Sequence, residues 1–202
     1  QGICLDIGTY KGWFSYYANQ YFSFDKILCV EPNKDLTKEI ENRLKDIDNI
    51  TIDNIAFSNK IGSAKYYYHQ DPAMNSIVSA DNALLKEEFP YDNPDYIKSE
   101  HIDILDLDTY AKNRNILGNN IFLKIDTQGN ELNILNSAKK ILKAVQVCII
   151  EHMFTNPYNS DYNFLDLVSF MDKNNFRMAG PVNITKRPSN KVSAVDFVFY
   201  KK

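Results

Sequence analysis

The sequence is poor in cysteine and in motifs that would bring cysteines together. Its three cysteines, Cys4, Cys29 and Cys148, lie far apart, and none has CxxC spacing. Each lies within an apolar, strand-like segment, which favours buried, reduced thiols over a bonded or metal-binding set. Reduced thiols of this kind are typical of a cytoplasmic protein, and we predict that location.

Long hydrophobic runs and an excess of basic charge are also missing. No apolar stretch approaches the roughly 20 residues that a membrane span needs, and no signal peptide is recognisable. The formal net charge is -3, with acidic and basic residues interspersed, so there is no basic face of the kind that neutralises phosphates. We therefore expect neither a membrane span nor a nucleic-acid partner.

What is present is the composition of an ordinary globular domain. The chain has 202 residues, of which 44% are hydrophobic and 24% are charged, enough for one sizeable core. We expect a single domain over residues 1–202. Because a core strand follows Gln1 almost at once, we also expect this domain to be excised from a longer protein.

Short apolar segments alternate with segments of helical periodicity along most of the chain. Strands are predicted at 3–7, 27–30, 50–55, 122–125 and 147–150, and helices at 10–21, 36–47, 132–142 and 164–171. Two further strands are predicted at 176–178 and 196–200. This order predicts an α/β fold with a mostly parallel central sheet and helices on both faces. A strand at 65–69 precedes an insertion, at about 70–101, that we expect to lie over the active edge of the sheet.

The turn after the first strand has the features of a ligand-binding loop. Asp6 ends the strand, and Gly8, Thr9, Tyr10 and Gly12 follow, with two glycines that permit close approach of the backbone to a ligand. Tyr10 occupies the place of the second glycine in a GxGxxG fingerprint, the one that admits a pyrophosphate. This disfavours an NAD-dependent oxidoreductase. S-adenosylmethionine has no phosphate, so the loop need only admit its amino-acid end.

The next two strand ends supply groups suited to a nucleoside. Glu31 ends the second strand, where a carboxylate can accept both hydroxyls of a ribose. After the third strand, Asn54, Ile55 and Ala56 combine a polar group for the edge of adenine with small and apolar groups for its face. The order of these signals favours an adenosyl ligand more than any one of them does.

Four segments together resemble the FkbM family of methyltransferases: 6–12 (DIGTYKG), 30–33 (VEPN), 55–58 (IAFS) and 123–131 (LKIDTQGNE). The resemblance spans about residues 2–152. It implies a Rossmann-like class I methyltransferase fold with an antiparallel last strand, S-adenosylmethionine as cofactor, and methylation of hydroxyl groups, often on sugars or secreted metabolites.

The resemblance also implies roles for individual residues. Asp6, Gly8 and Gly12 correspond to contacts with the methionine end of the cofactor, Glu31 to contacts with the ribose, and 54–56 to contacts with adenine. Two positions depart from the family pattern. Tyr10 stands where the family usually has Asn, and Gln128 stands where it usually has Glu, which removes a charge near the expected active centre.

The methyl acceptor should meet a proton-accepting group at the ends of the fourth and fifth strands. Asp126 ends one, and Glu151 and His152 end the other. His152 is our preferred base because a neutral imidazole accepts a proton near pH 7, and Asp126 is its rival. The same three residues are also a possible ligand set for a divalent metal, but without diagnostic spacing we assign no metal ligand.

We expect Lys124 and Glu131 to form a structural ion pair, and His69 and His101 to be surface residues.

The sequence thus favours an S-adenosylmethionine-dependent O-methyltransferase that acts on a sugar or glycan hydroxyl. The acceptor partner would be a small molecule or glycan with a free hydroxyl, and glycosyltransferase domains are candidate neighbours in the full-length protein. Two alternatives stay open. One is an O-methyltransferase of a non-sugar metabolite. The other is a cofactor-binding but inactive assembly domain, which Gln128 would favour.

Overall fold

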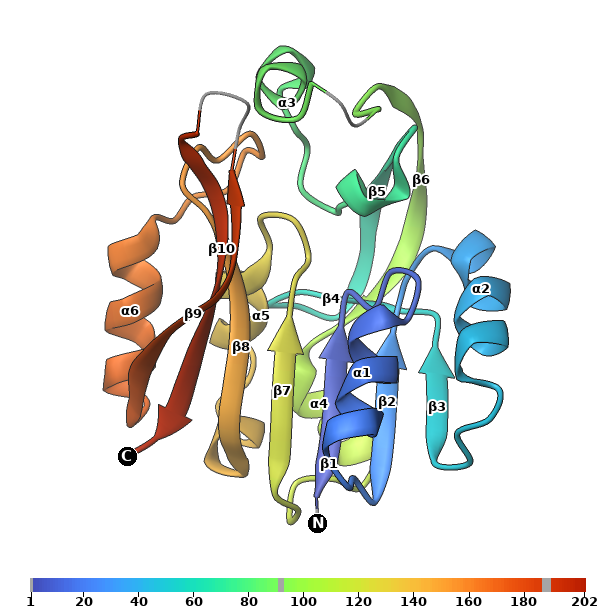
Figure 1. Cartoon of the computed structure of the whole chain (residues 1–202), viewed down its shortest axis with the longest axis vertical. Coiled ribbons are helices and arrows are strands. Elements are labelled where there is room, and N and C mark those ends of the chain that lie inside the picture. Colours follow the sequence, from blue (N-terminus) through green and yellow to red (C-terminus); the bar gives the residue numbers. More distant parts are fainter. Residues whose placement is uncertain (1, 91–92, 187–189) are drawn as a thin grey trace.

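A seven-stranded sheet forms the centre of the computed structural model, which describes residues 2–90, 93–186 and 190–202 (Figure 1). Its strand order is β3-β2-β1-β7-β8-β10-β9. The first five of these strands run parallel, and β10 is antiparallel to both β8 and β9. The predicted α/β fold, with its antiparallel end, is confirmed. The strands are β1 (Ile3–Ile7), β2 (Lys26–Val30), β3 (Ile50–Asp53), β7 (Ile121–Ile125), β8 (Val145–Met153), β9 (Phe176–Lys186) and β10 (Val192–Lys201).

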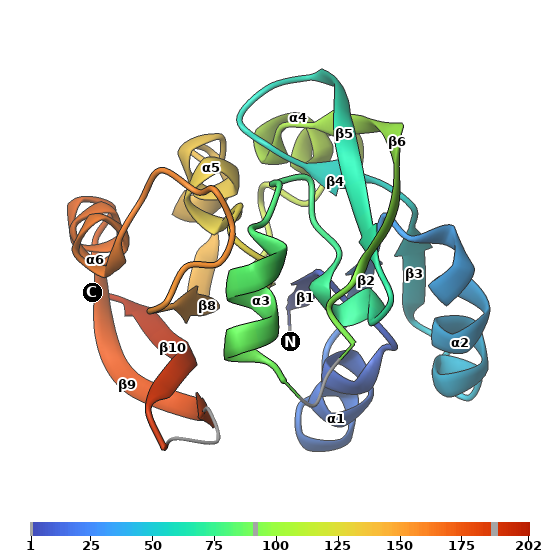
Figure 2. The ribbon, with the colours of Figure 1, turned by 90° about the horizontal axis from the view of Figure 1, so that it is seen from above.

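Helices cover both faces of this sheet (Figure 2). One face carries α1 (Trp13–Tyr21) and α2 (Lys34–Leu44), and the other carries α4 (Leu107–Asn113), α5 (Glu131–Asn136) and α6 (Phe164–Lys173). The short 3-10 helix η2 (Ile141–Lys143) replaces the end of the predicted helix at 132–142.

Side chains of β1 alternate between the two faces because successive residues of a strand point in opposite directions. Cys4 packs in the cluster formed with α1 and α2, whereas Leu5 and Ile7 pack in the larger cluster with α4, α5 and α6. All five residues of β1 are buried, as predicted for a strand covered on both sides.

Helix starts follow from the residues that precede them. The Asn33 side chain accepts a hydrogen bond from the Asp35 backbone N–H, which caps α2. The first helix begins at Trp13 and not at Tyr10. Tyr10 and Gly12 have φ angles of 53° and 82°, in the left-handed region, which an α-helix does not use.

A second, three-stranded sheet rises above the carboxyl ends of β1, β2 and β7 (Figure 1). It has the order β4-β6-β5 and consists of β4 (Ala56–Phe57), β5 (Gly62–His69) and β6 (Tyr96–Leu105). The insertion at 70–101 holds η1 (Pro72–Met74), α3 (Asn82–Glu88) and most of β6. The predicted strand at 50–55 ends at Asp53, and the chain then turns so that Ala56 and Phe57 pair with β6 in the second sheet.

His69 is not the surface residue that the sequence predicted. It is buried, its backbone N–H donates to Asn75 Oδ1 at 2.7 Å, and its ring Nδ1 lies 2.7 Å from the Pro94 carbonyl oxygen. The ring therefore holds the base of the insertion. His101, in contrast, is exposed on β6 as predicted.

The three cysteines, Cys4, Cys29 and Cys148, are free and buried, as predicted. In the described part of the chain, none of the helices combines the length and apolar character that a membrane crossing requires.

Candidate active site

A pocket of about 250 Å³ lies at the carboxyl ends of β1, β2, β7 and β8. Its floor comes from the ends of these strands, including Gly8, Glu31, Asp126 and Glu151. Its roof comes from the insertion, through residues 72–77 and Phe89. Ligands of open α/β sheets bind at this edge, so the pocket is the candidate active site.

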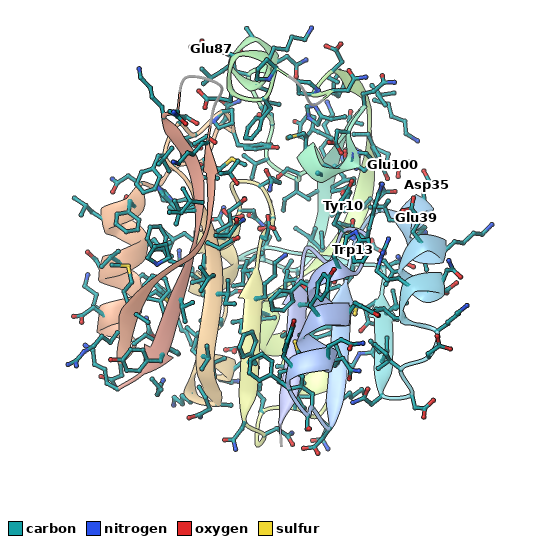
Figure 3. All side chains as sticks on the ribbon, in the orientation of Figure 1. Tyr10, Trp13, Asp35, Glu39, Glu87 and Glu100 are labelled. Carbon is teal, nitrogen blue, oxygen red and sulfur yellow. The ribbon has the colours of Figure 1, made fainter. Side chains whose placement is uncertain are left out.

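The loop after β1 forms one wall of the pocket and depends on Gly8. The φ angle of Gly8 is 78°, and a Cβ atom there would collide with the Asp126 carbonyl oxygen, so only glycine fits where the ends of β1 and β7 meet. Tyr10 also lines the pocket, and its hydroxyl donates to Asp71 Oδ1 of the insertion at 3.5 Å. Figure 3 shows Tyr10 above the start of α1, near Trp13.

Glu31 lies in the pocket with its carboxylate fixed in place. Oε2 accepts a hydrogen bond from the Tyr10 backbone N–H, and Oε1 accepts one from the Asn33 backbone N–H, both at 2.9 Å. Burial raises the pKa of Glu31 to about 7, although both backbone bonds favour the charged form. Each oxygen keeps a lone pair for a further donor such as a hydroxyl.

Asp6, Thr9 and Gly12, which the sequence predicts to contact a cofactor, do not line the pocket. Asp6 is fully buried beneath the loop, where Oδ2 accepts from Ser15 Oγ at 2.7 Å and Oδ1 lies 3.6 Å from Lys124 Nζ. Thr9 Oγ1 donates to the Asp6 carbonyl oxygen, and Gly12 is the N-cap of α1. These residues shape the loop from below, since Asp6 and Thr9 make their side-chain hydrogen bonds with α1 or within the loop, and Gly12 starts that helix.

Of the three residues expected to contact adenine, two line the pocket and one does not. Ile55 and Ala56 line the pocket together with Phe57. Asn54 does not, because its side-chain amide donates to the Glu31 carbonyl oxygen at 3.1 Å and to Thr37 Oγ1 at 2.8 Å. The polar group at this end of the pocket is Asn130, which also donates to the Phe57 carbonyl oxygen at 2.7 Å.

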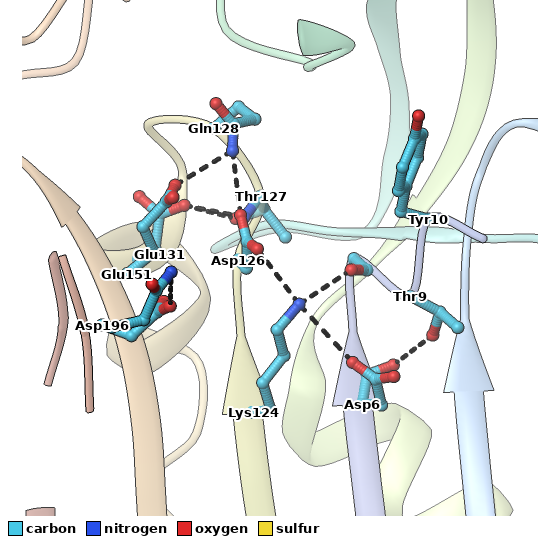
Figure 4. A network of polar contacts seen from close by, with 12 residues as sticks. Asp6, Thr9, Tyr10, Lys124, Asp126, Thr127, Gln128, Glu131, Glu151 and Asp196 are labelled. Atoms are coloured by element: carbon cyan, nitrogen blue, oxygen red, sulfur yellow. Dashed lines mark hydrogen bonds and ion pairs between the residues drawn. The ribbon is translucent and has the colours of Figure 1, made fainter. Parts of the chain in front are cut away.

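Two carboxylates face the pocket at the ends of β7 and β8, and an amide joins them (Figure 4). Gln128 Nε2 donates to Asp126 Oδ1 and to Glu151 Oε2, both at 2.9 Å. Gln128 has a φ of 58°, so the turn itself directs the amide toward the two acids. Burial, and next the negative charge of Asp126, hold the pKa of Glu151 well above its usual range.

His152 does not join this pair, although it is the next residue after Glu151. Its ring lies on the other side of β8, with centroids of Phe154, Tyr162 and Phe164 at 5.1, 5.6 and 5.5 Å. Burial lowers the pKa of His152 to about 4. His152 is the base preferred from the sequence, but its ring points to the face of β8 opposite to Glu151, because adjacent strand residues point to opposite faces.

Lys124 and Glu131 have separate partners and do not form the ion pair predicted for them. Lys124 Nζ donates to the Gly8 carbonyl oxygen at 2.9 Å and lies 3.2 Å from Asp126 Oδ2 (Figure 4). Glu131 accepts hydrogen bonds from Thr127 N and Oγ1, from Gly129 N and from the Tyr162 hydroxyl. Both side chains therefore organise the turn after β7.

Asp126, Glu151 and His152 do not converge on one point, since His152 faces away from the other two. Within residues 2–90, 93–186 and 190–202, no group of three or more His, Cys, Asp or Glu side chains is arranged to hold a metal ion.

Sequence reasoning missed the residues that close the pocket from above and from the side. The roof residues Met74, Ser76 and Phe89 come from the insertion, and Thr185 comes from β9. Ser76 Oγ lies 2.9 Å from the Gln128 carbonyl oxygen and 3.1 Å from that of Thr127, which fastens the roof to the turn after β7. No local motif marks these contacts because they join segments about 50 residues apart.

Comparison with known proteins identifies a family. A family model described as the Methyltransferase FkbM domain matches residues 6–178. No curated protein matches the sequence of this chain.

Solved structures of methyltransferases have a similar fold. The structure of methyltransferase FkbM from Methylobacillus flagellatus KT matches with a TM-score of 0.58 and 14% identity over 99% of this chain and 43% of that chain. A candidate S-adenosylmethionine-dependent methyltransferase from Listeria monocytogenes matches with a TM-score of 0.54 and 12% identity, over 100% of this chain and 92% of that one. A candidate tRNA methyltransferase from Streptococcus pneumoniae, in complex with S-adenosylmethionine, gives 0.53 and 10%, over 100% and 67%. The chain spans less than half of the Methylobacillus protein.

Proposed function

Because this chain belongs to the FkbM family of methyltransferases, we propose that it transfers a methyl group from S-adenosylmethionine to a hydroxyl group of a sugar or glycan. One observation carries the proposal. A single pocket contains the fixed carboxylate of Glu31 at one end and the amide-bridged pair of Asp126 and Glu151 at the other.

The groups that face the pocket fit an adenosyl ligand. Glu31 offers one free lone pair on each oxygen, which suits the two neighbouring hydroxyls of a ribose. Ile55, Ala56 and Phe57 offer an apolar surface for adenine. Gly8 leaves room at the loop after β1 for the methionine end. When bound, the cofactor supplies an electrophilic methyl group on a sulfonium.

The acceptor hydroxyl needs a group that takes its proton, and we assign this role to Glu151, with Asp126 beside it. The pKa of Glu151 is raised, so in its ionised form it is a stronger base than an ordinary carboxylate. Gln128 holds both acids in place through its amide N–H groups, so the proton acceptor is already oriented. Alignment of the two reactants in one pocket should supply much of the remaining acceleration.

The acceptor class, the cytoplasmic location and the linkage to glycosyltransferase domains stay proposals. Gln128 is the observation that favours the inactive assembly domain, because it places a neutral amide where the family usually has a carboxylate. Its bridging position supports an active site instead, since the amide relieves the repulsion between two neighbouring acids.

The test compares Glu151→Gln with His152→Phe, two adjacent changes on opposite faces of β8. Transfer of labelled methyl groups to a panel of glycosides and non-sugar alcohols is measured, together with calorimetric binding of S-adenosylhomocysteine. Glu151→Gln should lower kcat by a factor on the order of 10² or more and leave cofactor binding intact. His152→Phe should keep kcat within about threefold.

Three results would contradict the proposal. Cofactor binding without transfer to any acceptor would favour the assembly domain. Transfer to alcohols but not to glycosides would favour a non-sugar metabolite. Loss of kcat in His152→Phe, with cofactor binding unchanged, would return the role of base to His152.

A further inference from the structure

The acceptor half of the pocket is lined by carboxyl groups and has no cationic side chain in its wall. These are the carboxyl groups of Asp126 and Glu151, whereas that of Glu31 lies at the cofactor end. Among the described residues the wall of the whole pocket includes no Lys, Arg or His. We propose that this half of the pocket selects acceptors by charge, an inference that rests on the methyl transfer proposed above. It favours hydroxyl compounds that carry an amine, accepts neutral ones, and rejects those that carry a phosphate or carboxylate.

The cation nearest to the pocket, Lys124, already has carboxylate partners. Lys124 Nζ lies beneath the floor, 3.2 Å from Asp126 Oδ2 and 3.6 Å from Asp6 Oδ1, and it also donates to the Gly8 carbonyl oxygen. Two carboxylates thus share one ammonium group, so Lys124 has no spare charge for an anionic acceptor.

A further acid lies behind the pair that faces the pocket. Asp196 of β10 is directly opposite Glu151 of β8 in the antiparallel ladder, and residues opposite each other point to the same face. Its only hydrogen-bonding partner among the described side chains is Asn183, a neutral amide that donates to Oδ2 at 3.0 Å. Asp196 is therefore a third acid at this end of the pocket, behind Asp126 and Glu151.

Apolar side chains strengthen the electrostatic effect of these acids. The pocket is also lined by Met74, Ile77 and Phe89 of the insertion and by Met153 of β8. Apolar walls that exclude water leave charges weakly screened. An anionic group that enters would lose its water shell and find no cationic partner. An ammonium group would lose its water as well, but it would meet Glu151 and Asp126.

The test uses methyl glycosides that differ in charge on one scaffold: glucosamine, N-acetylglucosamine, glucose 6-phosphate and glucuronic acid. Turnover is measured as kcat/KM, and binding to the S-adenosylhomocysteine complex is measured by NMR, so that the ranking is obtained even from glycosides that are not methylated. The amine should exceed the neutral N-acetyl compound at least tenfold, and both anions should fall at least tenfold below it.

A charged variant at the rim of the pocket, with an uncharged variant as its matched control, tests the role of charge directly. Thr185 lines the pocket from β9 without a part in the proposed chemistry. Thr185→Lys should raise kcat/KM or binding of the two anions relative to the neutral glycoside at least tenfold, and Thr185→Met, of similar length but uncharged, should not. Anions that rank with the neutral glycoside in the unmodified protein would overturn the charge selection and leave the cofactor assignment standing. Failure to bind S-adenosylhomocysteine would overturn both proposals.

Discussion

Two glutamates near the end of β8 show how differently one side chain can be used. Glu131, on the side of α5, is buried, and its carboxylate accepts hydrogen bonds from two backbone N–H groups and two hydroxyls. Glu151, on the pocket side, is partly exposed, and its Oε2 accepts a hydrogen bond from the Gln128 amide. The carboxylate with all its bonds made stabilises the turn, and the one with spare lone pairs is free for a ligand.

The largest expected effect is on the free energy of unfolding, which should differ between variants of these two glutamates. Glu131→Gln should cost about 3 kcal/mol in the free energy of unfolding, because an amide oxygen cannot replace a carboxylate that serves several donors. Glu151→Gln should stay within about 1 kcal/mol of the unmodified protein. Urea unfolding at pH 7 measures both.

The variant Glu151→Gln should also show a pH-dependent stability relative to the unmodified protein. Because the pKa of Glu151 is raised, its contribution to stability is present below about pH 4.5 and is lost as the pH rises toward the folded-state pKa. The stability of Glu151→Gln relative to the unmodified protein should therefore improve as the pH increases from 4.5 to 8. Equal costs for the two variants at every pH would refute the distinction drawn between the two glutamates.

His152 should make the side facing α6 sensitive to acid. Its pKa is lowered from 6.5 to about 4 by burial, so its contribution to stability is present above pH 6.5 and is lost as the pH falls toward 4. Between pH 7 and pH 4 the unmodified protein should lose about 2 to 3 kcal/mol more than His152→Phe does. Urea unfolding at both pH values gives the difference, and parallel losses in the two proteins would show that His152 does not titrate in this range.

The smallest effect concerns one hydrogen bond on the same side. The Tyr162 hydroxyl donates to Glu131 Oε2 at 2.6 Å, and Tyr162→Phe should cost about 1 to 2 kcal/mol. Tyr21→Phe, which alters a ring that is 79% exposed, is the control and should change stability by less than about 0.5 kcal/mol. Thermal unfolding of the two variants side by side checks this, and similar shifts in Tm would contradict the role given to Tyr162.

Features encoded by neighbouring residues could be predicted from the sequence. The strand that ends at Ile7, the glycine turn at Gly8 and the acid at Glu31 form a local pattern, and the structure brings Gly8 and Glu31 into one pocket. The cap at Asn33 is another local feature, because it depends only on a side chain and on the backbone N–H two residues later.

Features that depend on pairing between distant segments, or on the face of a strand to which a side chain points, could not be predicted from the sequence. The small sheet forms because Ala56 and Phe57 pair with strand β6, which begins about 40 residues later. His152 and Glu151 are adjacent in sequence, and only the register of β8 against β10 decides which of them meets the pocket. Gln128 looked like the loss of a charge, whereas its position between two acids makes the amide useful.

The burial of Cys4, Cys29 and Cys148 has a practical consequence. Thiol reagents attack exposed thiolates, so cysteines placed at Glu87 on α3 and at Glu39 on α2 would be the ones that maleimide dyes reach in the folded protein. A fluorophore pair at these two positions, both labelled in Figure 3, would report the height of α3 above the sheet by energy transfer. The three cysteines of this chain therefore need not be removed before such distance measurements.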